Sequence, residues 1–300
     1  MPSIKLSRLV AAAHAPFHRD GSLNLAVVEK QAAHLIENRV MTAFICGSTG
    51  ESHSLTSAER AALAARWMEV SKGTGLQVVV HVGSNCLEDA RQLAAQAEEL
   101  GAAAISALAP SYFKPRTVDL LVDCCAHIAS AAPRTPFYFY DIPVLTGVNF
   151  SMSEFLEKAA TRLPSLAGIK FTNADLMAYQ LCLKVGGGAW DIPWGIDEAM
   201  LGALAAGATG AVGSSYNFAA PIYHRLWDAF AAGDLAAARA AQLESIRLIQ
   251  LLAEFGYMAA AKAVMAQQGV DVGPPRLPNA SLSDARKEAL MERLAPFCLT

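Results

Sequence analysis

The sequence predicts an α/β protein, a (β/α)₈ TIM barrel with a C-terminal helical extension. The first observation is that short apolar runs alternate with longer amphipathic stretches, as parallel strands alternate with crossover helices. The second is that 300 residues, 53% of them hydrophobic, are enough to bury one large core. A doubly wound sheet shares the same local pattern and is the alternative fold.

The strand candidates are short apolar runs that end close to glycine, proline or polar residues. Side chains alternate between the two faces of a strand, so Tyr138, Tyr140 and Ile142 share one face and Phe137 and Phe139 share the other. The eight candidates are Leu9–Ala13, Thr42–Cys46, Gln77–Val82, Ala104–Ala109, Phe137–Ile142, Ala167–Thr172, Asp191–Gly195 and Ala208–Gly213.

Helices are predicted between these strands and after the last one. Leu87–Leu100 carries apolar residues at helical spacing, and Thr56 and Ser151 each precede a glutamate by three residues, as in a capping box. Strand signals stop after residue 232, and three helices are expected beyond it, namely Leu235–Phe255, Tyr257–Gln268 and Leu282–Leu294. We expect a barrel at residues 1–232 and a helical extension at 233–300 that packs on the barrel.

Charge and composition narrow the class of partner. The formal net charge is −3 with both signs interspersed, which favours a small-molecule substrate and predicts no nucleic-acid or membrane partner. No run reaches the roughly 18 apolar residues of a membrane span. The N-terminal apolar stretch stops at His14, which is too early for a signal peptide, so we expect a cytoplasmic protein.

Cysteine and histidine spacing predicts neither disulfides nor a metal. No CxxC pair occurs, which is typical of a reduced intracellular protein, and the seven histidines show no HxH or HExxH spacing. We therefore expect no metal. The six cysteines are Cys46, Cys86, Cys124, Cys125, Cys182 and Cys298.

Lys170 is a lone amine in the apolar run Leu166–Phe171. Desolvation of an ammonium among apolar neighbours lowers its pKa and raises the fraction of free amine, as Schiff-base chemistry requires. The competing interpretation is a lysine at a strand end that extends to water.

Three other strand ends carry polar groups. The turn Gly47–Glu51 offers backbone N–H groups and two hydroxyls to an anion, or it only turns the chain. Tyr140 is either a proton carrier or a core aromatic. Asp197 and Glu198 either accept hydrogen bonds from substrate hydroxyls or form an acidic pair at a helix N-terminus.

Five ordered motifs and the proline-rich segment near the end resemble a known family over nearly the whole chain. They resemble the N-acetylneuraminate lyase family of the pyruvate-dependent class I aldolases, in the dihydrodipicolinate synthase-like superfamily. The motifs are Gly47-Ser-Thr-Gly-Glu51, Tyr140-Asp-Ile-Pro-Val-Leu-Thr-Gly147, Gly168-Ile-Lys-Phe-Thr172, Gly195-Ile-Asp-Glu198 and Gly207-Ala-Thr-Gly-Ala-Val-Gly-Ser-Ser-Tyr-Asn217, followed by Gly273-Pro-Pro-Arg-Leu-Pro278.

The resemblance implies a role for each matching residue. Lys170 would form an imine with the pyruvyl carbon, and Tyr140, with Ser48 in its relay, would carry protons. Ser48 and Thr49 would bind the pyruvyl carboxylate. The residues that would line the pocket for the sugar-derived tail are Thr172, Gly195, Asp197, Glu198 and Ser214.

The resemblance also implies an activity and an assembly. The expected reaction is reversible cleavage of N-acetylneuraminate to N-acetylmannosamine and pyruvate, without a cofactor. Tyr112 would extend toward the site of a neighbouring subunit in a homo-oligomer, expected to be a homotetramer.

Three positions depart from the pattern of the family or its relatives. Related dihydrodipicolinate synthases have an arginine, needed for a second carboxylate, where this chain has Leu145, which argues against that activity. Ala15 stands where a threonine is usual, and His53 where small residues are common.

Three alternative functions stay open. The first is another class I lyase or dehydratase that acts on a different 2-keto-3-deoxy sugar acid. The second is a non-catalytic sialic-acid binder, and the third is an unrelated barrel isomerase of sugar phosphates.

Overall fold

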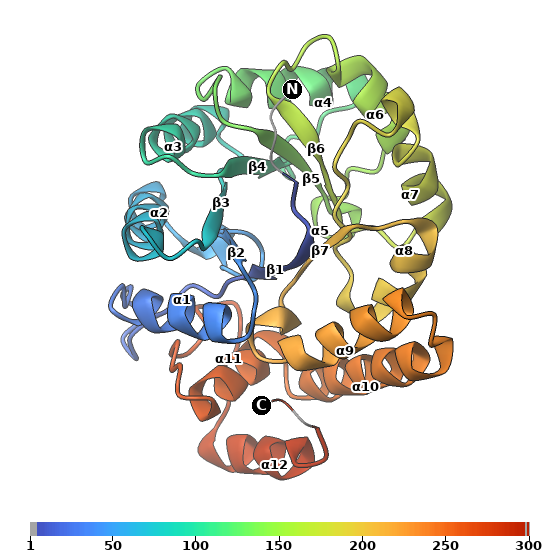
Figure 1. The fold of residues 1–300 in the computed structure, drawn as a ribbon. Coiled ribbons are helices and arrows are strands. Elements are labelled where there is room, and N and C mark those ends of the chain that lie inside the picture. Colours follow the sequence, from blue (N-terminus) through green and yellow to red (C-terminus); the bar gives the residue numbers. More distant parts are fainter. Residues whose placement is uncertain (1–4, 298, 300) are drawn as a thin grey trace.

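The computed structural model describes residues 5–297 and 299, which form a ring of parallel strands surrounded by helices (Figure 1). The sheet order is β6-β5-β4-β3-β2-β1-β7, so the strands follow chain order until β7 pairs with β1. This is the predicted TIM barrel. Its strands are β1 (Arg8–Ala12), β2 (Thr42–Ile45), β3 (Gln77–His81), β4 (Ala104–Leu108), β5 (Phe137–Asp141), β6 (Leu166–Phe171) and β7 (Gly210–Gly213).

The predicted strand at Asp191–Gly195 forms isolated bridges instead of a continuous strand. Pro193 has no N–H group to donate to a neighbouring strand, which interrupts the ladder. The segment nevertheless closes the barrel between β6 and β7, because Trp194 bridges both Phe171 and Ala211. Its carbonyl accepts a hydrogen bond from the Val212 N–H at 2.7 Å.

Most helices lie around the strands as an outer ring, whereas the short α5 lies near the barrel centre (Figure 1). Their bounds are α1 (Val27–Glu37), α2 (Ser57–Ser71), α3 (Leu87–Glu99), α4 (Val118–Ala129), α5 (Pro143–Thr146), α6 (Met152–Ala159), α7 (Leu176–Cys182), α8 (Met200–Ala206), α9 (Ala220–Ala231), α10 (Leu235–Glu254), α11 (Tyr257–Gln267) and α12 (Asp284–Leu294). Short 3₁₀ turns are η1 (Ser52–Ser54), η2 (Val185–Gly187), η3 (Asp197–Ala199) and η4 (Ser215–Asn217).

The helix starts agree with most of the predicted caps. Thr56 and Glu59 form the complete capping box that was expected before α2. Ser151 accepts a hydrogen bond from the Glu154 N–H, but the Glu154 carboxylate pairs with Lys158 at 3.2 Å. The last helix begins later than the predicted Leu282, because Ser283 caps it.

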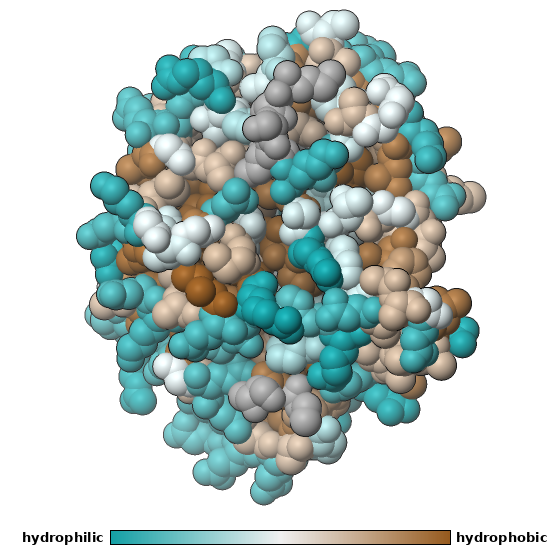
Figure 2. Space-filling model, in the orientation of Figure 1, coloured by the Kyte–Doolittle hydropathy of each residue, from teal (hydrophilic) through white to brown (hydrophobic). Residues whose placement is uncertain are grey.

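Two layers of apolar side chains confirm the predicted alternation along β5. Tyr138 and Tyr140 belong to the cluster inside the barrel, with Phe44 from β2. Phe137 and Phe139 belong to the larger cluster between strands and helices. Viewed in the same orientation, hydrophilic residues cover much of the outer surface, with hydrophobic residues scattered among them (Figure 2).

The C-terminal helices pack against the helices of the barrel and against one another. α10 contacts α8 and α9, and α11 contacts α10. Within residues 5–297 and 299 no single helix is long and apolar enough to cross a membrane, although α10 and α11, bent by 110°, pass that test as a pair. The division at residue 232 stays a prediction. The cysteines at 46, 86, 124, 125 and 182 are free, and Cys298 lies outside the described residues.

A buried ion pair ties this C-terminal segment to the turn after β2. Lys262 of α11 lies 2.7 Å from the Glu51 carboxylate, and the two side chains are 2% and 1% exposed. The Arg276 N–H donates to the same carboxylate at 2.8 Å, and Lys262 also donates to the Ala15 carbonyl at 2.9 Å. The C-terminal segment therefore fixes the position of the turn.

Replacing Lys262 with Met tests this link. The variant leaves the Glu51 carboxylate buried without its cation, so the free energy of unfolding in urea should fall by about 3–5 kcal/mol. Lys287→Met is the matched control, because Lys287 pairs with Asp284 on the surface of α12 and its loss should change stability little. Equal, small effects of the two substitutions would contradict the structural role of the buried pair.

Candidate active site

A cavity of about 630 Å³ opens at the carboxyl ends of the strands. This is where parallel barrels carry their active sites. The nine site residues predicted from the strand ends and from the family resemblance all line it, so the fold brings together groups from four strands and the 191–195 segment. They are Ser48, Thr49, Tyr140, Lys170, Thr172, Gly195, Asp197, Glu198 and Ser214.

Lys170 lies inside the barrel mouth and is 4% exposed. Its Nζ is 3.8 Å from the centroid of the Tyr140 ring and 4.1 Å from that of Phe44. Burial lowers the pKa of Lys170 to about 7, an effect that the Asp197 carboxylate opposes. The side chain does not extend to bulk water, so that competing interpretation is wrong, and a large fraction of the amine is neutral near pH 7.

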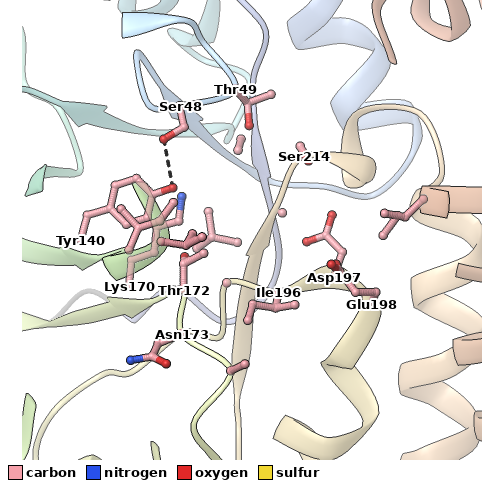
Figure 3. Close-up of a pocket in the computed structure, with 18 of the residues that line it drawn as sticks. Ser48, Thr49, Tyr140, Lys170, Thr172, Asn173, Ile196, Asp197, Glu198 and Ser214 are labelled. Atoms are coloured by element: carbon pink, nitrogen blue, oxygen red, sulfur yellow. Dashed lines mark hydrogen bonds between the residues drawn. The ribbon is translucent and has the colours of Figure 1, made fainter. Parts of the chain in front are cut away.

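Tyr140 places its hydroxyl group 3.4 Å from the Ser48 Oγ (Figure 3). Burial raises the pKa of Tyr140 to about 12, while the hydrogen bond to Ser48 opposes that rise. The phenol therefore holds its proton at neutral pH. Its ring packs edge-on against His81 and Phe44, which fixes the hydroxyl beside the amine of Lys170.

His81 supports Tyr140 as a neutral imidazole. The Leu108 N–H donates to His81 Nε2 at 3.3 Å, so the ring proton lies on Nδ1, 3.0 Å from the Cys46 carbonyl. Burial and the charge of Arg60 hold the pKa of His81 well below its usual range.

The turn Gly47–Glu51 presents Ser48 and Thr49 to the cavity. A Cβ at Gly47 would lie 2.7 Å from the Phe44 ring, so glycine lets the turn rest on the barrel interior. In the part of the chain that the structure describes, the N–H groups of Ser48 and Thr49 donate to no backbone carbonyl. Two hydroxyls and two available N–H groups can hold a carboxylate there.

Asp197 and Glu198 lie across the cavity from Lys170, as Figure 3 shows. Burial raises the pKa of Asp197 to about 6, and hydrogen bonds from Ser215 oppose that rise. The Asp197 carboxylate accepts the Ser215 N–H at 2.9 Å. Asp197 and Glu198 also lie in the first turn of η3, so they form an acidic pair at a helix start as well as lining the cavity.

Two glycines make this arrangement possible. A Cβ at Gly213 would lie 1.9 Å from Asp197 Oδ1, and a Cβ at Gly195 would lie 1.9 Å from Thr172 Oγ1. Any larger residue at either position would displace a predicted site residue.

Tyr257, Ile249 and Asn173 are among the cavity-lining residues that sequence reasoning missed. Tyr257 of α11 places its hydroxyl group 2.7 Å from Ser214 Oγ, and Ile249 comes from α10. No motif marks either residue, because they belong to the C-terminal helices. Asn173 follows Thr172, and its strand-end position is a signal that could have found it.

The structure leaves four other positions outside the cavity. Tyr112 is 78% exposed on the loop after β4, and Leu145 is 62% exposed in α5. Ala15 is buried beside Lys262, and His53 is exposed in η1. Among residues 5–297 and 299 no cluster of His, Cys, Asp or Glu is arranged to hold a metal ion.

Comparisons with known proteins agree with this geometry. The family model described as "Dihydrodipicolinate synthetase family" matches residues 5–296. A curated N-acetylneuraminate lyase from Gallus gallus is 38% identical over 98% of this chain and 97% of its own length.

Two solved structures cover almost the whole chain. The N-acetylneuraminate lyase of Proteus mirabilis is 39% identical with a TM-score of 0.96, over 99% of this chain and 100% of that one. That of Aliivibrio salmonicida is 40% identical with a TM-score of 0.96, over 99% and 98%. Because the family model spans nearly all of the described residues, this chain belongs to the dihydrodipicolinate synthetase family.

Proposed function

We propose that this chain is a Schiff-base (class I) aldolase that reversibly cleaves N-acetylneuraminate to N-acetylmannosamine and pyruvate. The observation that carries the proposal is the buried amine of Lys170, 3.8 Å from the centroid of the Tyr140 ring and facing an anion-binding turn. The similar proteins from Gallus gallus, Proteus mirabilis and Aliivibrio salmonicida are all named N-acetylneuraminate lyase, which supports N-acetylneuraminate as the substrate.

The mechanism begins with attack of the Lys170 amine on the ketone carbon of the substrate. The substrate carboxylate binds Ser48, Thr49 and their N–H groups, which places the ketone beside the amine. Loss of water gives a protonated imine, which draws electrons from the bond between its α-carbon and the hydroxyl-bearing carbon beyond it. No other cofactor is required for this step.

Tyr140 carries the protons of this reaction. Tyr140 first gives its phenol proton to the water that leaves as the imine forms, which makes Tyr140 a phenolate. As the carbon–carbon bond breaks, the substrate hydroxyl that becomes the aldehyde returns a proton to this phenolate, with Ser48 3.4 Å away as the relay. The resulting enamine takes a proton on carbon, and hydrolysis of the imine releases pyruvate and restores the free amine.

The lining of the cavity favours a hydroxyl-rich tail. Lys170 is the one cationic side chain among the described residues that line it, while Asp197 and Glu198 are acidic. Leu145 supplies no guanidinium for a second carboxylate. Another class I lyase or dehydratase acting on a different 2-keto-3-deoxy sugar acid is the nearest alternative, and the tail-binding residues decide between them.

The remaining parts of the proposal concern partners and location. We propose a homotetramer in which the exposed Tyr112 approaches a neighbouring subunit's site, and a cytoplasmic enzyme that acts on small molecules. Tyr112 stacks edge-on against Phe113, which is 86% exposed, so the pair offers an apolar surface to a second copy.

Reductive trapping tests the role of Lys170. Borohydride with pyruvate should label the peptide that contains Lys170, and Lys170→Met should abolish both labelling and turnover. Because the amine reacts only when deprotonated, the initial rate of trapping should rise with pH through about 7 and then level off. Labelling of another lysine in the variant would relocate the nucleophile.

Replacing Tyr140 with Phe tests the proton carrier. The substitution keeps the ring contacts and removes the hydroxyl, so turnover should fall by roughly 10²–10⁴-fold with little change in the thermal melt. Steady-state cleavage and calorimetry measure the two effects. A fully active variant, or one that is inactive because it unfolds, would return Tyr140 to a core role.

A substrate comparison tests the choice of reaction. We expect cleavage of N-acetylneuraminate to be faster than condensation of pyruvate with aspartate semialdehyde, because no arginine lines the cavity of the described chain. Rates measured in parallel on one preparation decide the point. Faster condensation would refute the lyase assignment.

A further inference from the structure

A chain of buried hydrogen bonds runs from α10 to the Asp197 carboxylate. Gln242 Nε2 lies 3.3 Å from Ser245 Oγ, which lies 2.9 Å from the Tyr223 hydroxyl. The Tyr223 hydroxyl lies 2.7 Å from Ser215 Oγ, and Ser215 Oγ in turn contacts Asp197 Oδ2. The chain therefore links two helices outside the barrel to a carboxylate inside its mouth.

The orientation of the Gln242 amide fixes one end of the chain. The Leu201 N–H donates to Gln242 Oε1 at 2.8 Å, so the NH₂ group faces Ser245 and the backbone carbonyl of Asp197, which is 3.2 Å away. An amide NH₂ can only donate. Ser245 must therefore accept from Gln242 and use its own proton elsewhere.

The Ser215 hydroxyl faces two acceptors, Asp197 Oδ2 and the Tyr223 hydroxyl, and its single proton can serve only one of them at a time. An ionised carboxylate can only accept, so when Asp197 is ionised the Ser215 proton goes to it. Tyr223 can then donate to Ser215, and Ser245 can donate to Tyr223. The intact chain can therefore supply a full series of donors to an ionised Asp197.

Burial prevents water from replacing any link. Ser215, Tyr223 and Ser245 are each 0% exposed, Asp197 is 5% exposed and Gln242 is 8% exposed. In such surroundings hydrogen bonds in series polarise one another, and a missing partner is costly. Gly213 lacks the Cβ that would strike Asp197 Oδ1, so the second oxygen has room beside the cavity.

We infer that Gln242, Ser245, Tyr223 and Ser215 are positioning residues that hold Asp197 as an ionised acceptor for a hydroxyl of the substrate tail. The inference rests on the proposed function for the identity of that tail. It gives α9 and α10 a part in substrate selection, although Gln242, Ser245 and Tyr223 do not line the cavity.

Other groups around Asp197 bear on its charge. Lys170 on β6 favours the carboxylate, whereas the neighbouring Glu198 disfavours it. The Asp197 carboxylate also interacts electrostatically with three tyrosines, namely Tyr216 in η4, Tyr257 on α11 and Tyr140 on β5. These groups are unchanged by substitutions in the chain, so a shift in Asp197 ionisation can be traced to the lost link.

Tyr223→Phe and Ser245→Ala cut the chain one step and two steps from Ser215. Tyr179→Phe is the matched control, because Tyr179 is also buried and donates 2.8 Å to the Ile192 carbonyl, with no bond to the chain. The KM for N-acetylneuraminate should rise by about 3–10-fold for Tyr223→Phe, and less for Ser245→Ala. Trapping of pyruvate on Lys170 should stay unchanged in all three.

Two further measurements distinguish a positioning role from a non-specific loss of structure. In an Asp197→Asn background, Tyr223→Phe should change KM by less than about twofold, because the chain then has no carboxylate to act on. An infrared titration of the carboxyl band that Asp197→Asn removes should show a higher midpoint in Tyr223→Phe than in the wild type. The infrared measurement needs no substrate.

The outcomes are distinct. Wild type that fails to cleave N-acetylneuraminate contradicts the proposed function, and the infrared titration still decides the inference. An unchanged midpoint in Tyr223→Phe overturns the inference. So do KM effects that match those of Tyr179→Phe or persist in the Asp197→Asn background.

Discussion

The burial of one amine is the constraint on which the rest of the site depends. The barrel interior keeps water away from Lys170, which destabilises the ammonium form and raises the fraction of reactive free amine. The same interior must still admit the carboxylate of a substrate close to that amine. Aromatic rings lie against the amine, and the Gly47–Glu51 turn presents Ser48 and Thr49 to the same cavity. Every strand end that lines the cavity supplies either an apolar group to the lining around the amine or a polar group that faces the amine.

The C-terminal helices belong to the site as much as to the scaffold. Lys262 fixes the turn that carries Ser48, Tyr257 contacts Ser214, and Ser245 lies on the chain that ends at Asp197. Each contact joins a helix beyond residue 234 to a different part of the cavity. A barrel without these helices would keep Lys170 and Tyr140 but would lose the partners that hold the residues facing them.

The sequence predicted groups that follow strands and missed groups that arrive from helices. Lys170, Tyr140, the turn at 47–51 and Asp197 were found because parallel strands end on one face of the barrel. Thr172, Gly195 and Ser214 were named through the motifs shared with the family. Tyr257 and the Gln242 chain depend on how α10 and α11 cross the barrel, which no local pattern encodes. The strand expected at Asp191–Gly195 was interrupted by Pro193, whose missing N–H was visible in the sequence.

The distribution of charge also sets the direction in which a substrate lies. Lys170, Tyr140 and Ser48 lie at one end of the cavity, and the carboxylates of Asp197 and Glu198 lie at the other (Figure 3). A keto acid bound in reverse would bring its carboxylate against Asp197 and Glu198, where repulsion is strong because the site is partly desolvated. The same repulsion acts on any aldehyde that carries its own carboxylate. Under the proposed function, one arrangement of charges would both select a neutral, hydroxylated tail and orient the keto acid, and the links through Lys262 and Ser215 hold that arrangement in place.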